Sequence, residues 1–99
     1  MTLIVLFETE TPTVEASLVS AIKELGEWAE LRRQAFLLDT PRAIRTVMEL
    51  LQPMLDPTDS LWVFTVSSPW SGHGDPIVED HLESRLGSEA DYTPRYRAD

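Results

Sequence analysis

The chain has 99 residues, 42% hydrophobic and 25% charged, which suits one folded domain with a real core. It has no cysteine, which excludes disulfides and thiolate metal sites, and no apolar stretch approaches the roughly 20 residues of a membrane helix. The net charge of −9 works against non-specific binding to nucleic acid, and with no basic leader before the first apolar run we expect a soluble, cytoplasmic protein.

The first expected strand is the apolar run at residues 3–7, LIVLF, which stops at Glu8. Its pattern fits a central strand covered on both faces, or one covered on one face and packed at an interface on the other. Thr11-Pro12 has the form of a helix cap followed by proline at the first helical position. Apolar residues at helical spacing then predict a helix over about 12–25. Gly26 falls where a left-handed C-terminal cap is expected.

Two strands are expected next, at 28–32 and 35–39. The residues between them, Arg33-Gln34, give a poor hairpin signal because neither is the glycine or asparagine that usually supplies a positive φ. Thr40-Pro41 repeats the cap signature and predicts a second helix over about 41–52, which Pro53 should kink or end.

The clearest strand is the run at 61–66, LWVFTV. The order strand, helix, strand, strand, helix, strand predicts an α+β, ferredoxin-like βαββαβ fold, a four-stranded antiparallel sheet with two helices on one face. Both sides of the last strand are apolar, so the uncovered sheet face should pack on something, most simply a second copy of the chain. The expected interface residues are Trp62, Phe64, Val66 and Trp70.

The remaining residues form a C-terminal extension beyond a ferredoxin-like domain at 1–70. Residues 71–87 should contain a short third helix that begins at Asp75-Pro76, ends at Gly87, and packs on the domain or its dimer mate. Residues 88–99 read as a flexible tail.

Three features occur together in this sequence: an aromatic residue after the glycine that follows the first helix, an aromatic-aliphatic strand before the second, and a proline followed by an Asp-rich turn and an apolar strand. They are carried by AIKELGEWAEL, QAFLLDT and LLQPMLDPTDSLWVFTV, with the strand end Leu6-Phe7-Glu8. Across about residues 3–70 the chain thereby resembles the SinR-like relatives of the CRISPR-associated adaptation subunit. The resemblance implies a sheet-to-sheet homodimer with a C-terminal strand at the interface.

The resemblance also suggests where chemistry would lie. Family members with nuclease activity carry an Asp at the end of the first strand, and the matching residue here is Glu8, one methylene longer. Two such carboxylates across a dimer axis could hold Mg²⁺ or Mn²⁺ and orient a water. The structural alternative is that Glu8 is simply where the strand reaches water.

Four arginines, half of the basic residues, are candidates for contacting phosphate: Arg32, Arg33, Arg42 and Arg45. A solvated or salt-bridged face is their alternative explanation. We expect a nucleic-acid- or defence-associated scaffold without nuclease activity. The alternatives are an acidic module that binds a basic protein through residues 76–91, and a metal-dependent endonuclease that uses Glu8.

Overall fold

The computed structural model describes residues 1–88, which divide into two compact units between Val66 and Ser67. The division lies slightly before residue 70, where the sequence suggested the first domain would end. The predicted tail lies, from residue 89 on, outside the described residues. None of the helices described is long and apolar enough to span a membrane.

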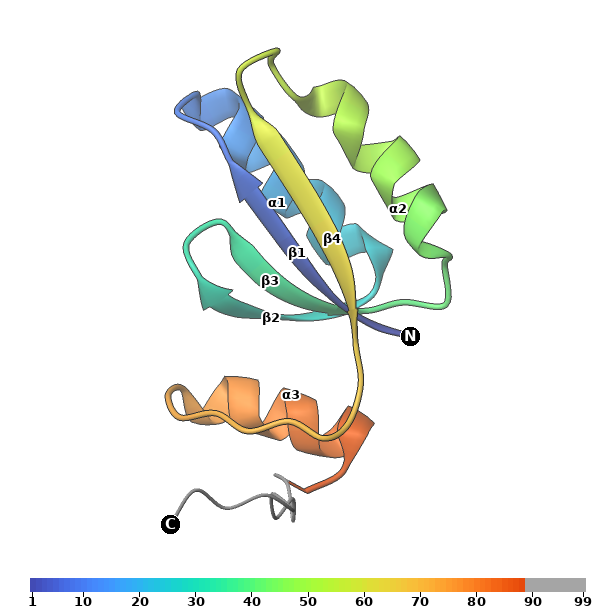
Figure 1. Cartoon of the computed structure of the whole chain (residues 1–99). Coiled ribbons are helices and arrows are strands. Elements are labelled where there is room, and N and C mark those ends of the chain that lie inside the picture. The colour runs from blue at the N-terminus through green and yellow to red at the C-terminus, as the bar shows by residue number, and fades with distance from the viewer. Residues whose placement is uncertain (89–99) are drawn as a thin grey trace, which may run out of the picture. The chain divides into compact units, whose positions relative to one another are not determined.

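The first unit contains the six predicted elements in the predicted order. They are β1 (Thr2–Glu8), α1 (Pro12–Leu25), β2 (Glu27–Arg32), β3 (Ala35–Asp39), α2 (Ile44–Leu51, followed by a 3₁₀ turn at Gln52–Met54) and β4 (Ser60–Val66). The strands form one antiparallel sheet in the order β2-β3-β1-β4, with α1 and α2 as the helical layer (Figure 1). The prediction of a ferredoxin-like α+β fold is confirmed.

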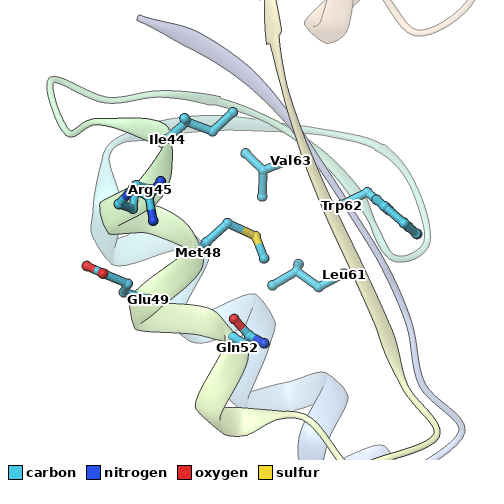
Figure 2. Close-up of a pocket in the computed structure, with 8 residues that line it drawn as sticks. All are labelled: Ile44, Arg45, Met48, Glu49, Gln52, Leu61, Trp62 and Val63. Atoms are coloured by element: carbon cyan, nitrogen blue, oxygen red, sulfur yellow. The ribbon is translucent and has the colours of Figure 1, made fainter.

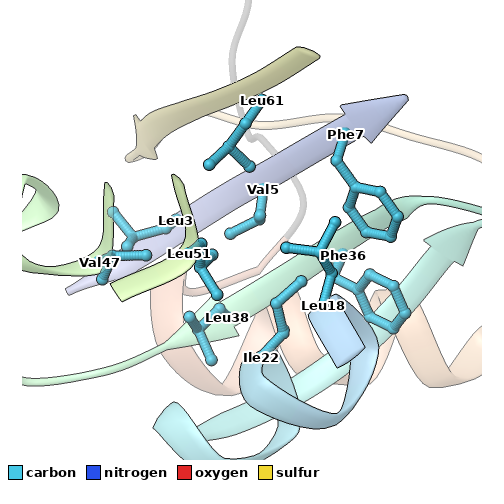
Figure 3. Close-up of a cluster of buried hydrophobic side chains, with 10 residues drawn as sticks. All are labelled: Leu3, Val5, Phe7, Leu18, Ile22, Phe36, Leu38, Val47, Leu51 and Leu61. Carbon is cyan, nitrogen blue, oxygen red and sulfur yellow. The ribbon is translucent and has the colours of Figure 1, made fainter. Parts of the chain in front are cut away.

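The core lies between the helices and one face of this sheet. Register fixes which side chains face inward, because directly opposed residues share a face: Phe7 lies opposite Leu61, and Val5 lies opposite both Phe36 and Val63. Figure 3 shows the side chains of Val5, Phe7 and Leu61 beside those of the two helices. The buried cluster consists of Leu3, Val5, Phe7, Leu18, Ile22, Phe36, Leu38, Val47, Leu51 and Leu61.

The second helix begins later than the sequence suggested. α2 starts at Ile44, after Ala43, and not at Pro41. The Thr40 amide donates to the Met1 carbonyl at 3.0 Å, and its hydroxyl accepts from the Arg42 amide at 3.2 Å. Thr40 therefore closes the β1–β3 ladder and a local turn, and it is not available to cap a helix.

The role predicted for Gly26 is also wrong. Its φ of 168° is extended, so it does not form a left-handed cap. A Cβ at this position would lie 2.0 Å from the carbonyl oxygen of Asp39. Glycine is needed here because the chain leaving α1 passes directly against the end of β3.

The second unit contains α3 (Pro76–Leu86), which matches the predicted third helix. Asp75 caps it, since its carboxylate accepts a hydrogen bond from the Ile77 amide at 2.9 Å. Trp70 is buried, and its indole Nε1 donates to the Gly87 carbonyl at 2.9 Å. This bond ties the segment before α3 to the residue just after it.

Candidate functional site

The segment that follows β1 is held in place by one side chain of the β2–β3 hairpin. Gln34 adopts a φ of 66°, the left-handed conformation that glycine or asparagine usually supplies. Its carbonyl accepts from the Phe7 amide at 3.0 Å. Its side-chain amide accepts from the Thr9 N–H at 3.2 Å and donates to the Thr9 carbonyl at 3.0 Å. The side chain thus pairs with Thr9 as a neighbouring strand would.

Glu8 lies at the end of β1, exposed, immediately before the residue that Gln34 holds. It borders an open hollow of about 640 Å³ together with Glu10, Arg32 and neighbouring residues of the hairpin. It also borders a second hollow of about 470 Å³ that is lined in part by Asp59. Glu8 is therefore accessible, as both a ligand role and a plain strand end would require.

One chain does not complete a metal site at this position. Within residues 1–88 no group of three or more histidine, aspartate or glutamate side chains is arranged to hold a metal ion. Mg²⁺ and Mn²⁺ favour several oxygen ligands. A divalent ion at Glu8 would therefore take its further oxygen ligands from water, from a bound substrate or from a second chain.

Arg33 is already engaged. Its Nε donates to Glu15 Oε2 at 3.0 Å and its Nη2 to Oε1 at 2.9 Å, a two-pronged ion pair between the hairpin and α1. The hydrogen bond from Arg33 is the main cause that lowers the pKa of the Glu15 carboxyl. The charge of Arg33 is thus largely balanced within the chain.

The four candidate arginines do not form one patch. Arg32 lies opposite Ala35, which lies opposite Leu6, so Arg32 and Arg33 belong to the end of the sheet where β1 finishes. Arg42 and Arg45 follow β3 and lie at the other end, where Thr2 is opposite Asp39. Clustering in the sequence therefore did not predict clustering in space, because β3 runs between the two pairs.

The sheet face away from the two helices is apolar, as predicted from the alternation along β4. Trp62 is 62% exposed and Phe64 53% exposed on this face. Register continues the apolar surface onto β1, where Leu6 lies opposite Trp62 and Ile4 opposite Phe64. We call this surface the open face. Of the four predicted interface residues, Trp62, Phe64 and Val66 lie on it, and Trp70 is buried in the second unit.

A groove that the sequence did not reveal lies between α2 and β4 (Figure 2). Its volume is about 500 Å³. The apolar side chains of Ile44, Met48, Leu61 and Val63 point toward one another across it, and Arg45, Glu49, Gln52 and Trp62 complete its lining. Helical periodicity marked the buried stripe of α2, but no local signal shows where two elements leave space between them.

Comparison with known proteins supports the fold. The chain is similar to Cas2 of Streptococcus pyogenes, whose crystal structure at pH 6.5 superposes with a TM-score of 0.55 and 20% sequence identity, over 67% of this chain and 86% of that one. At this identity the likeness concerns the fold alone. The sequence matches no protein-family model and no curated protein.

Proposed function

We propose that this chain is a homodimeric scaffold of the SinR-like, CRISPR-adaptation-subunit type, associated with nucleic acid or with a defence complex, and without nuclease activity. The observation that carries the proposal is the open face on a Cas2-like fold. Trp62 and Phe64 expose more than half of their surface there. Surfaces of this kind mark interaction sites when they are contiguous.

The exposed aromatic surface favours association. Covering the exposed parts of Trp62 and Phe64 would remove roughly 200 Å² of apolar surface per copy from water, about 5 kcal/mol. Ile4 and Leu6 would add to this contact. A second copy presents the same surface, so face-to-face packing around a two-fold axis covers both at once.

Contact with nucleic acid is assigned mainly to Arg42 and Arg45. Arg33 is paired with Glu15, and Arg32 shares its hollow with Glu8 and Glu10. The hairpin end of the sheet therefore repels phosphate more than it attracts it. Substituting Arg42 and Arg45 together with alanine should weaken binding and reduce its salt dependence, and the Arg32→Ala, Arg33→Ala double variant is the matched control.

A binding and cleavage assay tests the proposal directly. Labelled duplex DNA and RNA would be incubated at low salt with Mg²⁺ or Mn²⁺ against wild type, Glu8→Ala and the matched control Glu10→Ala. Binding without cleavage supports the scaffold. Cleavage that disappears in Glu8→Ala and persists in Glu10→Ala would replace it with a metal-dependent nuclease. A monomer in light scattering at micromolar concentration would refute the dimer.

The second candidate function is an acidic module that binds a basic protein. It is favoured by the exposed carboxylates of α3, Glu79, Asp80 and Glu83. Two further acids assigned to this strip, at positions 89 and 91, lie outside the described residues. Absence of nucleic-acid binding, together with a basic partner lost on neutralising the three helical carboxylates, would favour this function.

A further inference from the structure

The two edges of the sheet are built differently. β2, at one edge, carries charged side chains at Glu27, Glu30 and Arg32, and its register is irregular between Glu30 and Arg32. Charges and bulges are the devices by which proteins stop an edge strand from pairing with another chain. β2 is therefore a protected edge.

β4, at the other edge, has none of these devices. Its seven residues, SLWVFTV, include no charge and no proline, and its pairing with β1 is regular from Ser60 to Val66. Strands of this composition have high β propensity and offer a continuous row of outward backbone groups. Such an edge is a template for an incoming strand.

The groove beside this edge provides room for the side chains of that strand. It separates α2 from β4 on the helix side of the sheet, and Leu61, Val63 and Met48 form its apolar wall (Figure 2). Alternate side chains of an added strand point to this side. An added strand with apolar residues at alternate positions would therefore fill the groove with one set of side chains and extend the open face with the other.

We propose that the occupant is β4 of a second copy, paired antiparallel across a two-fold axis to make one continuous eight-stranded sheet. β4 has the alternation that the groove requires, with Leu61 and Val63 on the helix side and aromatic residues on the open face. β4 contains no charged residue. Although each copy has a net charge of −9, no charged side chains of the two paired strands would therefore repel one another.

The charged residues at the rim of the groove would be complementary between two copies related by a two-fold axis. Arg45 and Glu49 line it one helical turn apart, and neither forms an ion pair within the described residues. A two-fold axis makes the α2 helices of the two copies antiparallel. Arg45 can then face the partner's Glu49, and Glu49 the partner's Arg45. In the edge dimer the contact with nucleic acid proposed above would therefore fall to Arg42, which is exposed.

Edge pairing is separate from the face-to-face contact proposed above. It uses the backbone of β4 and the side chains on the helix side, whereas the face contact uses Trp62, Phe64 and Val66. Neither requires the other, and if their two-fold axes intersect, both together assemble four copies. Failure of one is therefore distinguishable from failure of the other.

Single-cysteine variants test the edge, because the natural sequence has no cysteine to interfere. Val63 is the middle residue of β4, so a two-fold axis at the centre of the strand places the two Val63 positions directly or diagonally opposite, about 5–8 Å apart. Val63→Cys should then be joined efficiently by a short bis-maleimide. Ile4→Cys is the matched control. It lies on β1 and the open face, where the edge dimer keeps the two copies about 14 Å apart, three strand spacings.

Each outcome of the cross-linking experiment either supports or overturns edge pairing. Dimers cross-linked through Val63→Cys, lost in urea, support edge pairing whether or not Ile4→Cys also reacts. Cross-linking through Ile4→Cys alone, or no cross-linking at either position in a variant with wild-type circular dichroism, overturns it.

Charge reversal at Arg45 and Glu49 gives a second, independent test of the edge dimer. Arg45→Glu and Glu49→Arg should each weaken dimerisation in sedimentation roughly tenfold, and the double variant should restore it, because the swapped pair has the same geometry. A double variant no better than either single one would contradict the two-fold arrangement.

Discussion

Gln34 offers a substitution whose two effects on stability can be separated. Gln34→Ala removes the two hydrogen bonds to the Thr9 backbone and keeps a side chain at a φ of 66°. Gln34→Gly removes the same bonds but also removes the steric cost of the left-handed conformation. The two variants therefore differ only in backbone preference.

The expected magnitudes follow from the structure. Each lost bond leaves a part-buried backbone group of Thr9 unpaired, about 1 kcal/mol each, so Gln34→Ala should lose about 2 kcal/mol of unfolding free energy. A non-glycine residue in this conformation costs about 1 kcal/mol, so Gln34→Gly should lose only about 1 kcal/mol. Of the two variants, Gln34→Gly should therefore be the more stable.

Urea unfolding followed by far-ultraviolet circular dichroism measures both variants against wild type. Hydrogen exchange at the Thr9 amide should accelerate in both. If Gln34→Ala is as stable as wild type, the pairing with Thr9 contributes nothing. If Gln34→Gly is less stable than Gln34→Ala, the backbone argument is refuted.

Three further predictions concern the same domain. Gly26→Ala should cost about 3 kcal/mol of unfolding free energy, because its Cβ would lie 2.0 Å from the Asp39 carbonyl oxygen; wild-type stability would mean that the backbone yields. Leu18→Ala should cost about 2–5 kcal/mol by opening a cavity at a side chain with no exposed surface, and a loss below about 1 kcal/mol in urea unfolding would contradict the packing. The Glu15–Arg33 pair lowers the pKa of Glu15, so its stabilisation is present above the usual value of 4.5 and is lost as pH falls through the lowered pKa; the stability difference between wild type and Arg33→Ala should therefore vanish in acid, and a difference independent of pH would refute it.

The architecture was predictable because its signals are local and strong. α1 begins at Pro12, the first helical position that the cap signature marked, and alternation along β4 correctly separated the core side from the exposed side. Strand order followed from the chain order of the elements and the right-handedness of crossovers. Each of these inferences uses only local residue patterns and the order of the elements along the chain.

The errors share a different physical origin. Thr40 and Gly26 both carried the local signal of a helix end, but each instead makes a contact with a residue far away in the chain, Met1 and Asp39 respectively. Gln34 gave no signal because its conformation is supported by Thr9, 25 positions earlier. Tertiary contacts decide these positions, and a single sequence does not display them.

The candidate site was predicted less well for the same reason. Glu8 was correctly placed at an exposed strand end. The ion pair that engages Arg33 links residues 18 positions apart, and the groove beside β4 depends on how two elements pack. Residue type identified the candidates, but only the fold shows which of them are available.

The separation of the two arginine pairs sets a length requirement on any nucleic acid that touches both. β3 stands between them, and its five residues span about 14 Å. Duplex nucleic acid rises about 3.4 Å per base pair, so about four base pairs are needed to reach from one end of the sheet to the other. A graded series of duplex lengths would therefore show a step in affinity if both ends take part, and a smooth dependence if Arg42 and Arg45 act alone.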